Sequence, residues 1–286
     1  MRFETEHTLI YRYSRPVFLE PQAIRLRPRE DGNQFVERFD LTIEPTPAGL
    51  THTIDARNNV FTYAWFNDTT ESLTVSSRSV VRTSRTNPFD FILDERSARL
   101  PIEYSPTDRH LLDLALTRLP HPAGPDDRVA AFARQLIEES DSNTLTFLSL
   151  LNHSLYDRTR IELREEGDPY PPARTFDEHC GACRDIAELF ADICRVAGIA
   201  CRFVSGYQEG DPDTTDRHLH AWAEVYLPNA GWRGFDPTHG LAVSDAHVAL
   251  AAAVRPADAA PTTGTFRGTD ATSKLDYDLQ IDITSN

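Results

Sequence analysis

Cysteine is scarce in this sequence, and long apolar runs are absent. The 286 residues include four cysteines, too few for the disulfide framework of a small secreted domain. No run approaches the roughly 20 apolar residues of a membrane-spanning helix. Residues 1–7 lack the apolar stretch of a signal peptide. We therefore expect a cytoplasmic protein that does not bind membranes, in which a reducing environment keeps the thiols free.

Nucleotide-binding motifs and excess positive charge are also absent. The chain has no P-loop, no G-x-G-x-x-G motif and no internal repeat, so we predict no cofactor. The formal net charge is −15, from 44 acidic and 29 basic residues. This balance argues against binding to nucleic acid or to an anionic membrane. The length and the 40% hydrophobic content predict two domains, each with its own core.

The first 100 residues are expected to form one of these domains. Residues 2–84 are rich in Thr, Val, Phe and Tyr, and turn residues such as Arg15-Pro16 and Asn58-Asn59 separate short alternating segments. Six strands at this spacing indicate an antiparallel β-sandwich. The domain contains no cluster of titratable groups that resembles a site. The expected strands are 3–13, 22–28, 35–45, 50–56, 59–66 and 71–83.

The second domain, 101–286, is expected to combine helices with an antiparallel sheet. A linker at 85–106 precedes a helix from Thr107 to Leu119. A second helix follows at 126–137, and a third opens at Asn143 or Thr144. The polar residues 158–178 are expected to form one lip of a cleft. Later segments give a strand at 246–251, a loop at 255–272 and an alternating strand at 275–283 that closes the domain.

Cys183 stands at the start of a predicted helix. Apolar residues follow it at helical spacing, and Gly198 is placed to end the helix. A thiol in the first turn lies at the positive end of the helix dipole, which favours the thiolate. Gly181 lets the chain approach closely. Most helical cysteines are instead buried core residues, and we predict that role for Cys194 and Cys201.

Cys180 and Cys183 also form a C-x-x-C motif. A redox role would need a preceding thioredoxin-like βαβ unit, which the sequence does not predict. A zinc site would need a second pair of ligands at matching spacing, and Cys194 and Cys201 do not form one. Both interpretations are therefore less favoured than a nucleophile.

Residues 209–216 form an acidic loop before the next predicted strand. Calcium is one interpretation, but the loop lacks the glycine and the terminal glutamate of an EF-hand. We favour a mobile loop at the edge of a cleft and predict no metal.

His220 and Asp236 are expected to lie on one β-hairpin. Residues 217–227 alternate, residues 228–231 form a turn, and residues 231–236 return as a second strand. Antiparallel pairing then brings the imidazole and the carboxylate within hydrogen-bonding reach. Neither residue is informative alone, because strand histidines and Asp-Pro pairs are usually structural. His218 lies on the same face and is an alternative base or metal ligand. Trp222 is expected either beside His220 in the cleft or in the core.

Four stretches of this region together resemble the transglutaminase-like superfamily, in particular its bacterial branch of candidate cysteine proteases: residues 181–185, 198–207, 220–228 and 231–238. The N-terminal segment from Arg2 to Tyr13 and beyond resembles the β-rich domain that precedes the core in that branch. The resemblance implies that Cys183 is the nucleophile, His220 the base and Asp236 its orienting partner. It also implies an α+β fold with a papain-like core, in which the Cys helix packs on an antiparallel sheet carrying the other two residues.

The function predicted from these residues is cysteine-dependent acyl transfer. The Cys183 thiolate would attack a peptide or amide carbonyl, His220 would carry the proton, and Asp236 would hold the imidazole. We favour hydrolysis of a peptide or protein substrate through a thioester. The alternatives are a protein-glutamine transglutaminase, which passes the acyl group to an amine, and a non-catalytic binding module on the same scaffold. The pattern does not predict an oligomeric state.

Overall fold

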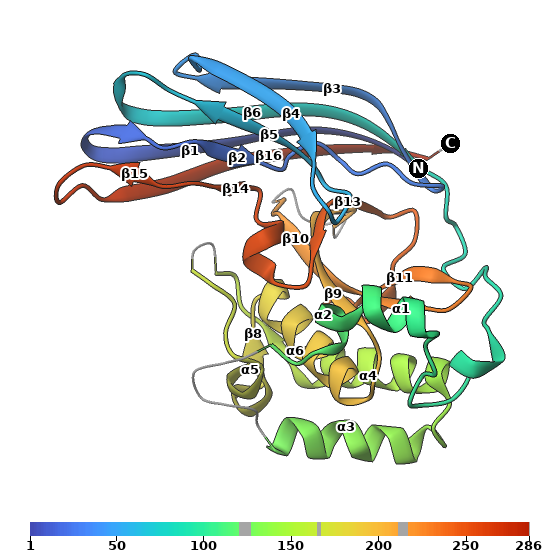
Figure 1. Ribbon diagram of the computed structural model, residues 1–286. Coiled ribbons are helices and arrows are strands. Elements are labelled where there is room, and N and C mark those ends of the chain that lie inside the picture. Colours follow the sequence, from blue (N-terminus) through green and yellow to red (C-terminus); the bar gives the residue numbers. More distant parts are fainter. Residues whose placement is uncertain (120–126, 165–166, 211–216, 286) are drawn as a thin grey trace.

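The protein has two halves, one made of long strands and one made mainly of helices around a smaller sheet (Figure 1). The computed structural model describes residues 1–119, 127–164, 167–210 and 217–285. Both termini lie at one end of the strand-rich half (Figure 1). Within the described residues, no helix is both long and apolar enough to span a membrane.

The strand-rich half is the predicted antiparallel sandwich. Its larger sheet has the order β15-β1-β6-β3, with β16 also paired to β1. The smaller sheet has the order β14-β2-β5-β4. All six strands expected within 3–83 are present. The bounds are β1 Arg2–Leu19, β2 Gln22–Ile24, β3 Gln34–Glu44, β4 Gly49–Ile54, β5 Val60–Trp65, β6 Thr69–Thr83, β14 Thr262–Thr263, β15 Phe266–Arg267 and β16 Ser273–Thr284.

Strand β1 continues through the break expected at Arg15-Pro16. Its pairing with β6 shifts register between Arg12 and Val17. A bulge can accommodate Pro16 because the ladder hydrogen bond that proline cannot donate is not needed there. The strand is therefore longer than its sequence pattern predicts.

The C-terminal strand β16 does not close the helical domain, and that expectation is wrong. β16 pairs antiparallel with β1 from Arg2↔Thr284 to Tyr13↔Ser273. Its buried Leu279 belongs to the sandwich core. The short strands β14 and β15, within the segment expected as a loop, also join the sandwich sheets. An alternating pattern identifies a strand but not its partner, so the return of the chain to the first half was not predictable.

Six helices are described in the other half. The helix expected over 107–119 is divided in two at Leu112, and it begins one residue early because the Ser105 side chain caps it by accepting from Asp108 N. Asn143 caps α4 as expected. The bounds are α1 Pro106–Leu111, α2 Asp113–Leu116, α3 Asp127–Glu139, α4 Thr144–Arg158, α5 Pro172–Glu178 and α6 Cys183–Val196.

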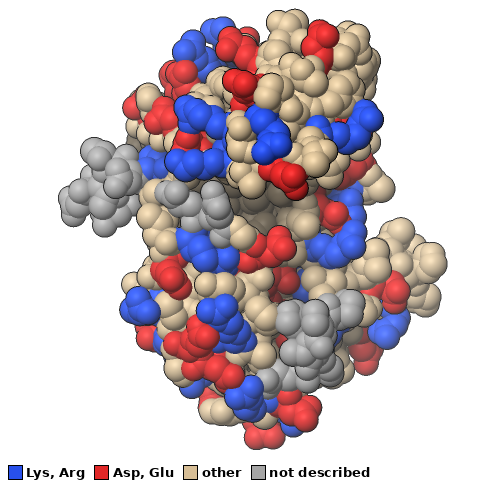
Figure 2. All heavy atoms as spheres, turned by 90° about the vertical axis from the view of Figure 1, so that its left-hand side faces the viewer, with Lys and Arg blue, Asp and Glu red and all other residues tan. Residues whose placement is uncertain are grey.

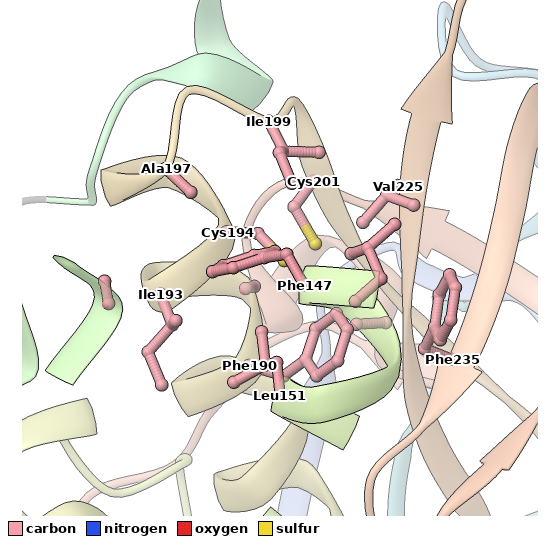
Figure 3. Packing of buried hydrophobic residues seen from close by; sticks show 14 of the residues in the cluster. Phe147, Leu151, Phe190, Ile193, Cys194, Ala197, Ile199, Cys201, Val225 and Phe235 are labelled. Atoms are coloured by element: carbon pink, nitrogen blue, oxygen red, sulfur yellow. The ribbon is translucent and has the colours of Figure 1, made fainter. Parts of the chain in front are cut away.

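A five-stranded antiparallel sheet, β12-β11-β10-β9-β13, supports these helices. Helix α6 packs on β9 and β10. Cys194 and Cys201 are fully buried between them, as predicted, beside Phe147 and Phe190 (Figure 3). This core holds the body of α6 against the sheet. The bounds are β9 Cys201–Gln208, β10 His220–Leu227, β11 Gly231–Asp236, β12 Leu241–Ala242 and β13 His247–Ala253, with β7 Arg160–Ile161 and β8 Cys180–Gly181 pairing separately.

The two halves share buried residues. Tyr207, Val248 and Leu250 come from the second sheet but pack in the core of the sandwich. Tyr207 Oη also lies 3.1 Å from Nδ1 of the buried His7 on β1. The sandwich is therefore fixed to the sheet that carries the candidate site.

Candidate active site

Cys183 is the first residue of helix α6, as the sequence predicts. Asp185, in the first turn, accepts a hydrogen bond from Ala182 N at 2.8 Å through Oδ2, which satisfies the backbone donor just before the helix. The Cys183 side chain is partly exposed, whereas the other three cysteines are buried. The accessible thiol thus lies at the positive end of the helix.

Asp185 also fastens the polar segment that precedes the helix. This carboxylate is fully buried, and its Oδ1 accepts from Arg164 Nη2 at 2.6 Å and from Tyr170 N at 2.7 Å. Residues 161–164 and 167–169 line the same cavity as Cys183. This lip of the cleft is therefore tied to the turn that presents the thiol.

His220 and Asp236 meet on the predicted hairpin. Ala223 pairs with Phe235, and from this register the two side chains converge at one end of the sheet. His220 Nε2 donates to Asp236 Oδ2 at 2.7 Å, and the carboxylate has no exposed surface. The hydrogen bond expected from the sequence is present.

Two further histidines bind the same carboxylate oxygen. His239 Nδ1 lies 2.9 Å and His247 Nε2 lies 3.2 Å from Asp236 Oδ2. Asp236 Oδ1 accepts from Thr238 N at 3.0 Å. Sequence reasoning missed both histidines. His239 follows Asp236 by three residues in a turn, which is a detectable signal, whereas the approach of His247 depends on how β13 packs.

The charge of Asp236 controls protonation in this cluster. Burial lowers the pKa of His220, but the charge and hydrogen bond of Asp236, with a smaller contribution from the Cys183 thiol, raise it to about 10. Burial opposes ionisation of Asp236, but hydrogen bonds from the three histidines and the charge of His220 hold its pKa well below 3.8. Burial lowers the pKa of His247. At neutral pH the site therefore contains an imidazolium beside a carboxylate.

A metal ion could use part of this cluster. Ligand atoms of His220, Asp236 and His239 lie within 4.8 Å of one another. However, the carboxylate oxygen already accepts three imidazole N–H groups, and a metal would have to displace these protons. The arrangement suits proton transfer better than metal binding.

The other sequence alternatives do not bond to the Asp236 carboxylate in the described residues. Cys180 is a free thiol whose Sγ lies 3.5 Å from Glu162 Oε2. His218 is exposed, and its Nδ1 contacts Tyr277 Oη. Trp222 is buried against the rings of His220 and His247. Of the two positions expected for this residue, it therefore takes the one in the core. Most of the acidic loop, 211–216, lies outside the described residues.

A cleft between the two halves contains the thiol. Its volume is about 480 Å³, and Cys183, His220 and His239 line it together with residues of β1, β16 and the lip. Figure 2 looks onto the side where the halves meet and shows acidic and basic side chains intermixed on both, with no extended patch of one sign. Charge on this face does not favour a strongly charged substrate.

Comparisons with known proteins agree with this architecture. Residues 130–237 match the model of the transglutaminase-like superfamily, and residues 3–82 match that of the bacterial transglutaminase-like N-terminal region. An uncharacterized protein of Mycobacterium leprae is 24% identical over 99% of this chain and 98% of its own length. A protein-glutamine gamma-glutamyltransferase of Pseudomonas aeruginosa is 38% identical, but only over 23% of this chain and 11% of its own length.

A solved structure shares the complete fold. It comes from Cytophaga hutchinsonii, is described as a candidate cysteine protease, and is 17% identical to this chain. The similarity covers 100% of this chain and 92% of the other, with a TM-score of 0.72. The sandwich and the helical half therefore occur together in another protein.

Proposed function

Because this chain belongs to the transglutaminase-like superfamily, we propose that it is a cysteine-dependent acyl-transfer enzyme with Cys183 as nucleophile. The observation that carries the proposal is the hydrogen bond from His220 to the buried Asp236, beside a partly exposed thiol at a helix start. These are the three groups that nucleophilic cysteine catalysis requires.

In the first half-reaction, Cys183 Sγ attacks the carbonyl carbon of the substrate and forms a C–S bond. Backbone N–H groups at the start of α6 hold the oxyanion. The C–N bond then breaks, and the departing amine takes the proton from His220. Asp236 keeps the imidazole oriented and stabilises its charged form. The products of this step are a thioester and a free amine.

In the second half-reaction, an acceptor attacks the thioester while His220 removes its proton, and the thiolate leaves. We propose water as this acceptor, which makes the enzyme a peptidase or amidase. The structural relative described as a candidate cysteine protease supports this choice. Transfer to an amine is the second candidate, supported by the short match to a protein-glutamine gamma-glutamyltransferase.

Acyl-enzyme trapping tests the proposal. Wild-type protein mixed with p-nitrophenyl acetate should gain one acetyl group on Cys183, detectable by peptide mass spectrometry and removable with hydroxylamine. Cys183→Ser should give no hydroxylamine-sensitive adduct. Acetylation of a different residue, or none, would refute the nucleophile. Adding an excess of a primary amine separates the two acceptors, because only a transferase converts most of the thioester to an amide.

A further inference from the structure

Four of the sandwich side chains that line the cleft containing Cys183 are apolar or aromatic. Leu9 and Tyr11 come from β1, and Leu275 and Tyr277 come from β16. Leu9 is paired with Tyr277, and Tyr11 with Leu275. The four thus lie on one face as two adjacent cross-strand pairs. We call these residues the apolar panel.

Both tyrosine hydroxyls of the panel are engaged at the rim of the cleft. Tyr277 Oη contacts His218 Nδ1, and Tyr11 Oη contacts Thr262 Oγ1. These bonds satisfy the polar end of each side chain. The rings then contribute apolar surface to the cleft, which is the usual role of a tyrosine at a binding site.

The lip adds a second apolar wall. Ile161 and Leu163 line the same cavity, yet the two residues are 54% and 66% exposed. Large apolar side chains left in water beside a nucleophile indicate a surface that a ligand covers.

Charged residues of the cleft are engaged by the protein. Arg164 pairs with Asp185 at 2.6 Å, and Arg184 donates to Arg164 O at 2.6 Å. Glu162 accepts from Cys180 at 3.5 Å. These contacts restrain the charged groups, so the apolar side chains of the two walls provide much of the surface that a bound substrate would meet.

We propose that the panel and the lip bind a large apolar side chain next to the carbonyl that Cys183 attacks. The N-terminal sandwich is then part of the substrate-binding site, and the substrate class is a peptide or acyl amide with a leucine- or phenylalanine-like residue at that position. This inference rests on the proposed function, because it needs Cys183 to be the nucleophile.

Two matched peptidyl chloromethyl ketones test the inference: acetyl-Ala-Ala-Phe and acetyl-Ala-Ala-Glu. In each reaction Cys183 Sγ bonds to the methylene carbon and chloride leaves. We expect the Phe probe to inactivate wild-type protein roughly 10- to 100-fold faster at low concentration, because it buries apolar surface that the Glu probe lacks. Equal rates for the two probes would overturn the inference.

Substitutions within β16 locate the effect. Leu275→Ser and Tyr277→Ser should each reduce the Phe preference severalfold. The matched control is Ile283→Ser, which removes a half-buried apolar residue from the same face of the same strand, opposite Phe3 and outside the cleft. It should leave the preference unchanged. The assignment of the panel as a binding surface would be contradicted if Ile283→Ser lost the preference for the Phe probe, or if both panel variants kept it.

Iodoacetamide separates this inference from the proposed function, because it has no side chain to recognise. Selective alkylation of Cys183 by iodoacetamide together with equal rates for the two peptidyl probes would leave the nucleophile in place and refute the panel. Failure of iodoacetamide to label Cys183 selectively would overturn both.

Discussion

At the candidate active site, one buried carboxylate oxygen, Asp236 Oδ2, accepts hydrogen bonds from three imidazoles. His220 interacts with Cys183, His239 lines the cleft, and His247 is buried. A carboxylate with this many donors stays ionised and cannot rotate freely. Asp236 therefore fixes both the orientation and the charge of His220.

Replacing Asp236 with asparagine should lower the pKa of His220 from about 10. The neutral amide cannot balance the effect of burial, so the imidazolium loses its proton at lower pH. NMR titration of ¹⁵N-histidine-labelled protein would measure the change. Acyl transfer should fall on the order of ten-thousandfold, as when the aspartate of a serine triad is neutralised. Asp270→Asn, which changes an exposed acid, is the control. If the titration midpoint of His220 were the same in Asp236→Asn as in wild type, Asp236 would not control the charge of His220.

The periodicity of short sequence segments predicts part of the site. Cys183 is identifiable because a helix pattern begins at it, and His220 and Asp236 because strand alternation and a turn set their register. His239 and His247 converge through the turn after β11 and the packing of β13. Local periodicity does not encode such convergence.

On the scale of elements, helix α6 carries three buried carboxylates, Asp185, Glu188 and Asp192, and the first two have opposite effects on stability. Asp185 is satisfied by three donors, from Arg164, Tyr170 and Ala182. Glu188 is 6% exposed, and its Oε1 has no hydrogen-bond partner among the described residues. Burial raises the pKa of Glu188 to about 7, although Arg195 opposes the shift. Asp185 thus stabilises the helix, whereas Glu188 is costly when it is ionised.

Glu188→Gln should make stability less dependent on pH. The folded-state pKa of about 7 lies above the ordinary 4.5, so the protonated form favours folding. The contribution of Glu188 protonation to the free energy of unfolding is complete below pH 4.5. It is lost as pH rises through about 7, a change of about 3 kcal/mol. The variant should therefore gain stability relative to wild type at pH 8 but not at pH 4. Urea unfolding at pH 4 and pH 8 measures the stability of both proteins. An equal stability difference between variant and wild type at the two pH values would disprove the role of Glu188.

Asp185→Ala should weaken both the helix start and the lip. Removing the carboxylate leaves Arg164 and the buried N–H groups of Ala182 and Tyr170 without this acceptor, at a cost of about 3–5 kcal/mol. Thermal unfolding would show a lower midpoint. Exposed Asp177→Ala on α5 is the comparison. Similar midpoints for the two variants would argue against this anchoring role.

Element types were easier to predict than their limits. The strands within 3–83, the helix from Cys183 and the His–Asp hairpin follow from periodicity and turn residues. The division at Leu112 does not, because the apolar residues around it continue at helical spacing.

For the whole molecule, the important feature is the shared core. Leu250 of β13 is fully buried in the sandwich core, and β16 returns to pair with β1. The sequence predicts two domains, each with its own core, but local patterns do not reveal which distant segments also pack together. The contacts join the halves and place sandwich residues in the cleft.

This shared core predicts a single cooperative unfolding transition. In scanning calorimetry, the calorimetric and van't Hoff enthalpies should agree. Leu250→Ala should cost about 2–5 kcal/mol and shift the whole transition downward. Two separate transitions, with only one moved by the substitution, would show that the halves unfold independently.

The most direct test of the Cys183–His220 pair is the rate at which iodoacetamide alkylates Cys183 at pH 6, measured by peptide mass spectrometry. Ordinary thiols react slowly at this pH because they are mostly protonated, and burial protects Cys180, Cys194 and Cys201. Exposure alone could favour Cys183, so the decisive comparison is His220→Ala. Rapid labelling of Cys183 that is lost in this variant is the predicted result. Equal labelling rates in wild type and His220→Ala would show that the imidazole does not activate the thiol.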